Sequence, residues 1–208
     1  MNGREAILRD IRAALRRPSP PSHAQPGPAW PSSAAHAEPP ADLAAAFRHK
    51  LEAAGGVWHE APDLAAAAAQ IAAFLPPGPV WVAMDDLPLE RPGVLRAMPA
   101  RDAFDSLVAT VTGVDCALAE TGSLGICFAP GAGRLASLIA PVHVAVVRRA
   151  QIVATLEHFF ARVRTHLGPR SAAVLVTGPS RSADIEQVLT IGVHGTREVH
   201  VVVIETSS

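Results

Sequence analysis

From residue 41 onward, short apolar runs alternate with longer segments of helical periodicity. The runs at 57–59, 80–83 and 141–147 have the length of strands. The segments 42–54 and 63–75 repeat apolar residues every three to four positions, and each begins at an aspartate that can cap a helix. Strands that alternate with helices are typical of an α/β domain with a largely parallel sheet. We therefore predict a layered α/β/α domain over residues 41–208.

The first forty residues follow a different pattern. Ile7, Ile11 and Leu15 stand at helical spacing with arginines on the other face, which predicts an N-terminal helix over 1–17. This helix either docks on a partner or lies against its own domain. Residues 18–40 contain eight prolines and cannot form a regular helix or sheet. The sequence therefore predicts a proline-rich linker between the helix and the domain.

The net charge, the apolar runs and the cysteine positions argue against several classes of protein. The net charge of −1 at pH 7 does not indicate a nucleic-acid partner or an acidic membrane surface. No apolar run reaches the length of a membrane span, and no secretory segment is recognisable. Cys116 and Cys127 form no C-x-x-C motif, and no histidine or cysteine cluster has metal-ligand spacing. We expect a soluble, cytoplasmic chain that binds no metal and no cofactor of its own.

A polar stretch separates two apolar runs near the end of the chain, at 172–176 and 199–204. It begins Thr-Gly-Pro-Ser-Arg-Ser-Ala-Asp-Ile-Glu at 177–186. Gly178 can end a strand and leave backbone N–H groups free to face a ligand, and the guanidinium of Arg181 suits a carboxylate or a phosphate. We predict an anion-binding turn at the carboxyl edge of the sheet. The alternative is an ordinary turn whose acidic residues favour the start of a following helix.

A second polar turn, Glu-Thr-Gly-Ser at 120–123, joins apolar runs at 116–119 and 124–129. Gly122 there can take a positive φ, as tight turns between neighbouring strands require. The carboxylate of Glu120 can serve as a general base, a nucleophile or a hydrogen-bond acceptor. A solvent-facing turn would use the same polar residues.

Two weaker candidates lie between these turns. The segment 131–136 fits the G-x-G-x-x-A form of a dinucleotide fingerprint, but Pro141 ends the following helix almost at once. We predict no dinucleotide site, although Arg134 can still face an anion. His143 lies at the start of an apolar run and is either a site residue or a hydrogen-bonded structural histidine. The complete predicted anion or substrate site consists of Thr121, Gly122, Ser123, Arg134, His143, Gly178, Ser180, Arg181, Ser182, Asp184 and His194, with Glu120 as the candidate catalytic residue.

Taken together, the motifs resemble the LUD-domain family, in particular its LutC-type lactate-utilisation proteins. The motifs are Ala-Glu-Thr-Gly-Ser at 119–123, the stretch at 177–186 and Gly-Val-His-Gly at 192–195. Residues 134–143 resemble the intervening Arg…Leu-Pro-x-His segment of the family, and the resemblance covers about residues 41–205. The departures are Ser123 for threonine, Thr196 for proline and Ala140 for leucine.

The resemblance implies a NagB/RpiA/CoA-transferase-like fold and a role in oxidising L-lactate to pyruvate. It also implies a complex in which LutA-like and LutB-like subunits carry the iron–sulfur clusters. A cluster needs about four thiolates, and this chain has two cysteines. The chain would therefore contribute binding of a small carboxylate or phosphate, complex assembly, or both. Two alternatives stay open: an independent enzyme acting on an acyl-CoA or a phosphorylated small molecule, with Glu120 as nucleophile or base, and a non-catalytic scaffold.

Overall fold

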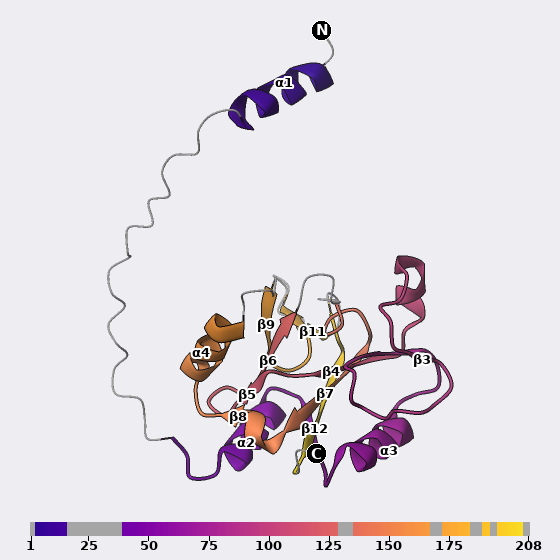
Figure 1. Cartoon of the computed structure of the whole chain (residues 1–208), viewed down its shortest axis with the longest axis vertical. Helices are drawn as coiled ribbons and strands as arrows, with labels where there is room; N and C mark the ends of the chain where they lie inside the picture. The colour runs from indigo at the N-terminus through magenta and orange to yellow at the C-terminus, as the bar shows by residue number, and fades with distance from the viewer. Residues whose placement is uncertain are drawn as a thin grey trace. The chain divides into compact units, whose positions relative to one another are not determined.

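The computed structural model describes residues 3–15, 39–128, 135–166, 172–183, 189–191 and 195–205. The chain divides into two units, residues 1–38 and 39–208. The first unit contains helix α1 (Gly3–Leu15), which occupies the predicted helical segment (Figure 1). Most of the predicted linker lies outside the described residues. None of the described helices is long and apolar enough to cross a membrane.

A six-stranded parallel sheet forms the centre of the second unit (Figure 1). Its strand order is β1-β12-β7-β4-β2-β3, and every neighbouring pair is parallel. This confirms the predicted parallel sheet. The strands are β1 (Val57–Ala61), β2 (Val80–Ala83), β3 (Val94–Leu95), β4 (Ala109–Gly113), β7 (Val142–Arg148) and β12 (Glu198–Ile204).

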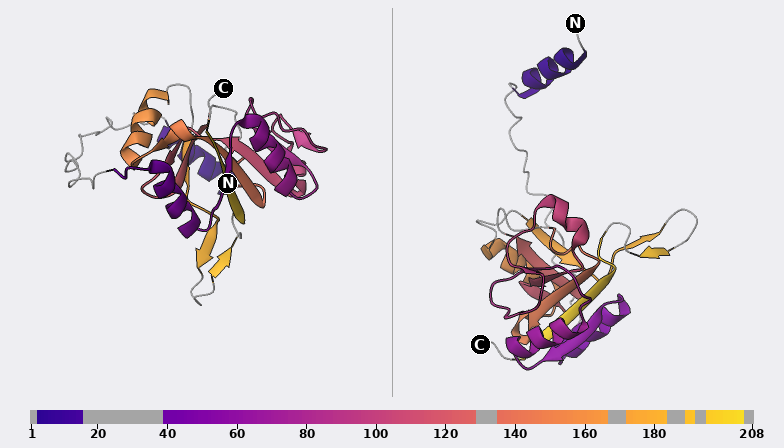
Figure 2. Two further views of the ribbon diagram at one scale, coloured as in Figure 1. Left: turned by 90° about the horizontal axis from the view of Figure 1, so that it is seen from below. Right: turned by 90° about the vertical axis from the view of Figure 1, so that its right-hand side faces the viewer.

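A second, mixed sheet was not predicted. Its order is β8-β5-β6-β9, in which β5 pairs with β8 in parallel and the other pairs are antiparallel. A third pair, β10 with β11, joins neither sheet, and its ribbon projects from the body of the second unit (Figure 2). These strands are β5 (Cys116–Leu118), β6 (Ser123–Phe128), β8 (Ile152–Val153), β9 (Ala172–Val176), β10 (Arg181–Ala183) and β11 (Leu189–Ile191).

The alternation of side chains along the parallel strands builds two cores. On β7, Val144 and Val146 face helix α3 (Leu64–Phe74), whereas Ala145 and Val147 face helix α2 (Leu43–Ala53) and the mixed sheet. Helix α4 (Leu156–His166) packs on β5 through Phe159. The predicted α/β/α layering is therefore correct in part: α3 covers one face of the parallel sheet, and α2 shares the other face with the mixed sheet.

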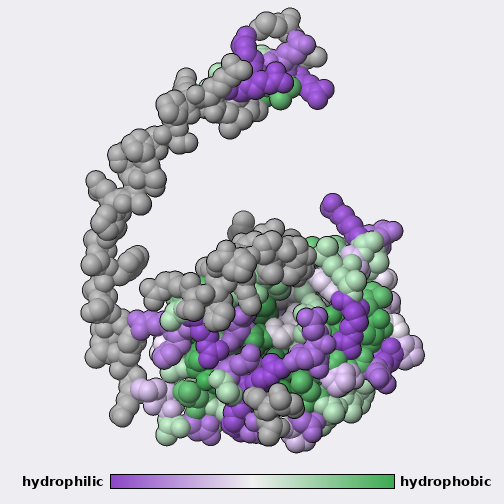
Figure 3. All heavy atoms as spheres, viewed as in Figure 1, coloured by the Kyte–Doolittle hydropathy of each residue, from purple (hydrophilic) through white to green (hydrophobic). Residues whose placement is uncertain are grey.

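Local signals set the helix starts as predicted. Asp42 precedes α2, and its Oδ1 accepts hydrogen bonds from the backbone N of Ala44 and Ala45 at 3.0 and 3.1 Å. Asp63 precedes α3 and accepts from the backbone N of Ala66 at 2.8 Å. Such caps satisfy backbone donors that the helix itself leaves unpaired. Hydrophilic and hydrophobic residues are interspersed on the face of the second unit that Figure 3 shows.

Two segments differ from what their apolar pattern alone suggests. Apolar residues recur at helical spacing from residue 152, but α4 begins at Leu156, because Ile152 and Val153 pair with Ala117 and Leu118 as strand β8. Sheet pairing here overrides helical periodicity. The run at 172–176 is a strand, but Leu175 is 40% exposed, so it is not buried on both faces. Two short 3₁₀ helices complete the described elements, η1 (Arg101–Ser106) and η2 (Arg149–Gln151).

Candidate functional site

The polar turn at 177–180 follows a strand of the mixed sheet. Strand β9 runs antiparallel to β6, so the turn does not lie at the carboxyl edge of the parallel sheet. The backbone N of Ser180 instead donates to the carbonyl O of Thr196 at 2.9 Å, and Thr196 lies just before β12 begins. The turn is therefore held beside the amino end of β12. The predicted position at the carboxyl edge was wrong, because it assumed that β9 belongs to the parallel sheet.

Two glycines bring both predicted polar turns against the end of α2. Gly122 has a φ of 72° and Gly178 a φ of 79°. A Cβ atom on Gly122 would lie 2.5 Å from the backbone N of Leu51, and one on Gly178 would lie 2.6 Å from the carbonyl O of Ala54. Both the conformation and the close approach require glycine. The predicted positive φ at Gly122 is confirmed.

A chain of hydroxyl groups connects the two turns. Thr121 Oγ1 lies 2.7 Å from Ser123 Oγ, which in turn lies 2.6 Å from Thr177 Oγ1. Ser123 is buried, so its hydrogen bonds are sheltered from water. The residues that the sequence analysis grouped at 121–123 and 177–180 therefore form one hydrogen-bonded unit, although they lie more than fifty positions apart.

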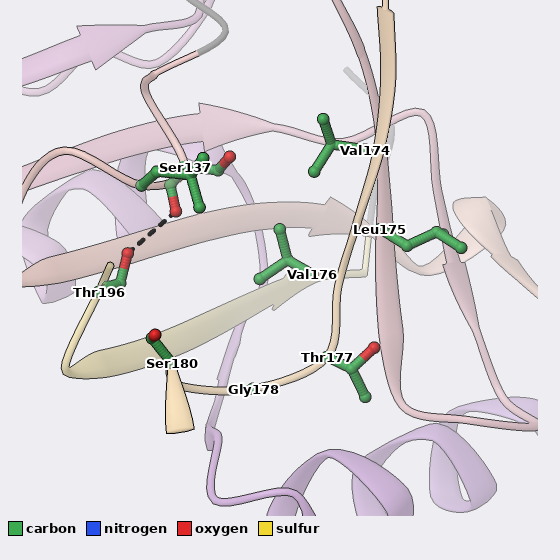
Figure 4. A pocket seen from close by; sticks show the side chains of 9 residues that line it. Ser137, Val174, Leu175, Val176, Thr177, Gly178, Ser180 and Thr196 are labelled. Atoms are coloured by element: carbon green, nitrogen blue, oxygen red, sulfur yellow. Dashed lines mark hydrogen bonds between the residues drawn. The ribbon is translucent and has the colours of Figure 1, made fainter. Parts of the chain in front are cut away.

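A cavity of about 210 Å³ borders this unit (Figure 4). We call it the β9–β12 cavity. Thr196 Oγ1 donates to the carbonyl O of Ser137 at 2.9 Å across its polar end, while Val174 and Val176 form its apolar wall. Ser180 also faces it. The complete lining is Ser137, Leu138, Val174, Leu175, Val176, Thr177, Gly178, Ser180 and Thr196.

The side-chain hydroxyl of Ser137 is an unpaired hydrogen-bonding group at this cavity. Its side chain is buried, and within the described part of the chain its Oγ has no hydrogen-bond partner. Buried hydroxyls in proteins are nearly always paired with protein, water or ligand. The cavity can therefore supply a hydroxyl to a small polar molecule. The predicted site did not include Ser137, Thr177 or Thr196, although Thr177 begins the motif at 177–186 and Thr196 follows the one at 192–195.

Glu120 is placed elsewhere. Its side chain is exposed, and Oε2 accepts a hydrogen bond at 3.3 Å from the backbone N of Leu156, the first residue of α4. The backbone N of Glu120 also donates to the carbonyl O of Ala154 at 3.0 Å. A carboxylate at a helix N-terminus is stabilised by the unpaired N–H groups there. Glu120 therefore acts as a cap of α4, and it is not among the residues that line the β9–β12 cavity.

This placement yields a prediction for Glu120→Gln. Glutamine keeps an acceptor for Leu156 N but removes the negative charge, so the free energy of unfolding should fall by about 0.3–1 kcal/mol. Urea denaturation measures this change. A variant of wild-type stability that lost turnover on an acyl-CoA or phosphorylated substrate would contradict the capping role and support Glu120 as nucleophile or base.

His143 is fully buried in β7, and its Nε2 lies 2.9 Å from Thr112 Oγ1. Burial lowers the pKa of His143 to about 4, so its imidazole is neutral at pH 7. It does not line the β9–β12 cavity and brings no positive charge to an anion there. The sequence analysis left two possibilities for His143, a site residue or a hydrogen-bonded structural histidine, and its burial and its bond to Thr112 fit the second.

Of the remaining predicted residues, two lie in β10. Arg181 and Ser182 lie in β10, where their backbones pair with Ile191 and Thr190. Arg134, Asp184 and His194 lie outside the described residues. The structure therefore brings together Thr121, Gly122, Ser123, Gly178 and Ser180.

The cysteines do not fit an iron–sulfur cluster. Cys116 is buried in β5, and burial raises the pKa of its thiol to about 11. A thiol of that pKa is protonated at pH 7, and a cluster needs about four thiolates where this chain has two cysteines. Within the described ranges, no group of three or more histidine, cysteine or acidic side chains could hold a metal ion.

Comparison with known proteins identifies relatives of this chain. The LUD domain model matches residues 97–204. Lactate utilization protein C of Deinococcus radiodurans is 35% identical over 114 residues, which are 53% of this chain and 54% of that protein. Lactate utilization protein C of Shouchella clausii is 32% identical over 98 residues, 46% of this chain and 43% of that protein. The chain thus spans about half the length of the curated relatives it matches.

A solved structure shares the fold. The crystal structure of a DUF162 family protein from Deinococcus radiodurans superposes with a TM-score of 0.61. The superposition covers 79% of this chain and 97% of that chain at 24% sequence identity. The likeness establishes the arrangement of helices and strands for most of the second unit.

Proposed function

Because this chain belongs to the LUD domain family, we propose that it is a component of a lactate-utilisation system that oxidises L-lactate to pyruvate. Relatives that bear the name lactate utilization protein C support this assignment. We further propose that the six-stranded parallel sheet belongs to a NagB/RpiA/CoA-transferase-like fold, and that residues 41–208 form the LUD domain behind a linker at 18–40.

The observation that carries the proposal is the β9–β12 cavity. Its polar end offers the hydroxyls of Ser137, Ser180 and Thr196, and its other wall is apolar. Lactate has the matching shape, with a carboxylate and a hydroxyl at one end and a methyl group at the other. In the proposed complex the hydroxyls of Ser137 and Ser180 donate to the carboxylate. Thr196 Oγ1, whose proton goes to the carbonyl O of Ser137, accepts from the hydroxyl of lactate, and the methyl group contacts Val176.

The cavity needs a positive charge to hold an anion firmly. None of its described lining residues is charged. Arg181 directly follows Ser180 in the chain, and a guanidinium is suited to bidentate binding of a carboxylate. We therefore propose Arg181 as the cationic group of the site. The hydroxyl of Ser180 would be an uncharged hydrogen-bond donor beside it.

An iron–sulfur cluster needs about four thiolates and this chain has two cysteines, so the proposed system needs further subunits to carry the clusters. We propose that iron–sulfur subunits of LutA-like and LutB-like type accept the electrons, and that this chain binds the substrate and takes part in assembly. This chain then binds no cluster of its own. Its soluble, cytoplasmic location is part of the same proposal.

An anaerobic pull-down tests the assignment. The tagged full chain is recovered from its native cells, and the eluate is examined for iron–sulfur absorbance and for dye reduction that depends on L-lactate. We expect both signals, and an untagged extract serves as the control. Clean recovery of the chain with neither signal would contradict the proposal and favour an independent enzyme or a scaffold.

Replacement of Arg181 by alanine tests the site itself. Loss of a charged hydrogen bond costs at least ~1.5 kcal/mol, so the affinity for L-lactate or pyruvate should fall more than tenfold. Isothermal titration calorimetry measures this affinity. Arg101, exposed on η1, supplies the matched control, since Arg101→Ala should leave the affinity unchanged. Equal affinities of the Arg181 variant and the wild type would remove Arg181 from the site.

A further inference from the structure

Thr196 lines the β9–β12 cavity with a hydroxyl oxygen that acts only as an acceptor toward a ligand. Its Oγ1 donates to the carbonyl O of Ser137 at 2.9 Å (Figure 4). A carbonyl oxygen carries no proton, so the direction of this hydrogen bond is fixed, and it uses the one hydroxyl proton of Thr196. The lone pairs of Oγ1 are the hydrogen-bonding capacity that remains for a molecule in the cavity.

Backbone hydrogen bonds hold Thr196 in place. Its carbonyl O accepts from the backbone N of Ser180 at 2.9 Å, and the backbone N of Arg197 donates to the carbonyl O of Pro141 at 2.8 Å. Thr196 is 4% exposed. If its hydroxyl turned its proton toward a ligand, the carbonyl O of Ser137 would lose this hydrogen bond, and an unpaired buried acceptor is costly. Thr196 therefore stays an acceptor when a ligand binds.

The hydroxyl of Ser137 has the opposite capacity. Its side chain is buried, and its Oγ has no hydrogen-bond partner within the described part of the chain, so its proton can go to a ligand. Ser180 adds a second hydroxyl to the lining. The polar end of the cavity thus places hydroxyl donors beside an oxygen that requires a donor. A matching ligand carries a hydroxyl group next to a group that accepts hydrogen bonds.

We infer that Thr196 makes this cavity selective for a 2-hydroxy acid over the 2-oxo acid that its oxidation gives, an inference that rests on the proposed binding of lactate. The hydroxyl of lactate donates to Thr196 Oγ1, and its carboxylate accepts from Ser137. Pyruvate has the same charge and carbon skeleton, but its keto oxygen brings lone pairs against the lone pairs of Thr196. A site that hydrogen-bonds a substrate hydroxyl rejects an analogue that lacks it. The cavity therefore holds the substrate more tightly than the product.

Chemical-shift titrations of the ¹⁵N-labelled full chain with L-lactate, pyruvate and propionate test this selectivity. Propionate has neither a hydroxyl nor a keto oxygen at carbon 2. We expect the wild type to bind lactate about fivefold or more tightly than pyruvate, because pyruvate leaves an acceptor of the site unpaired. Propionate should lie between the two, since it loses the hydrogen bond without opposing lone pairs.

Three variants assign the selectivity to one hydroxyl. Thr196→Val removes the accepting oxygen and should bring the affinities for lactate and pyruvate to within about twofold of each other. Thr196→Ser keeps the oxygen and should keep the preference. Ser137→Ala is the matched control, because it removes a donor to the carboxylate that both ligands carry. It should weaken both ligands alike and leave their ratio unchanged.

The outcomes separate this inference from the proposed function. Equal affinities of the wild type for lactate and pyruvate would overturn the selectivity and leave the lactate site standing. A preference that persists in folded Thr196→Val would show that another group selects the ligand. Absence of saturable lactate binding would remove the site and the selectivity with it. Circular dichroism establishes whether Thr196→Val is folded; if it is not, the wild-type ligand series and Thr196→Ser decide.

Discussion

Gly122→Ala is expected to lower the free energy of unfolding by roughly 2–5 kcal/mol. The φ of 72° disfavours any residue with a Cβ by about 1–2 kcal/mol. The added Cβ would also lie 2.5 Å from Leu51 N and 2.6 Å from Lys50 C. These neighbours are helix backbone, so relief requires α2 to shift, and overpacking of this kind costs about 1–3 kcal/mol. Urea denaturation followed by circular dichroism measures the loss.

Gly113→Ala is the matched control for this variant. A Cβ on Gly113 would meet its nearest neighbour, Met84 Cε, at 3.9 Å, which is an ordinary contact. We expect a change within about 1 kcal/mol, since removing a glycine also restricts the unfolded chain. Equal losses in both variants would show that the end of α2 is not fixed against the turn at 120–123. The hydroxyl chain through Ser123 would then not depend on that contact.

Stability should also fall steeply in mild acid because of His143. Burial lowers its pKa in the folded chain to about 4, whereas an unperturbed histidine titrates near 6.5. Between pH ~6.5 and 4 the histidine is therefore protonated in the unfolded chain but stays neutral in the folded chain. The stabilisation is complete above that pH and is lost as the pH falls toward 4, by roughly 3 kcal/mol in all. Urea denaturation at pH 7.5, 5.5 and 4.5 measures this slope.

His143→Gln separates this effect from general acid sensitivity. The variant is expected to be less stable at pH 7.5, since it alters a fully buried position, but its stability should fall less between pH 6.5 and 4. His158, exposed on α4, supplies the control, because His158→Gln should keep the slope of the wild type. An unchanged slope in His143→Gln would show that His143 is not the group that titrates.

The parts of the fold that depend on local chemistry could be predicted from the sequence. Asp42 and Asp63 cap their helices through backbone groups two or three residues away, so the signal and its effect lie together. The mixed sheet depends on distant pairing. Its strand β9 pairs with β6, about fifty residues earlier, and nothing in 172–176 distinguishes that partner from a strand of the parallel sheet.

The candidate site, like the fold, could be predicted from the sequence only in part. The sequence analysis assigned the turns at 120–123 and 177–180 to one predicted site, and the structure joins them through the Ser123–Thr177 hydrogen bond. It placed the turn at 177–180 at the wrong edge, because the sequence does not show to which sheet β9 belongs. The role of Glu120 was equally open, since a carboxylate at a strand end suits catalysis and capping alike. Its bond to Leu156 N comes from the packing of α4.

Nuclear magnetic resonance on the ¹⁵N-labelled full chain, titrated with L-lactate, tests most directly whether the β9–β12 cavity binds a small carboxylate. The account predicts saturable shifts of the backbone amide signals of Thr177, Gly178, Ser180 and Thr196, and their loss in Arg181→Ala. Absence of these shifts at saturating lactate, or shifts centred on Thr112 instead, would contradict it.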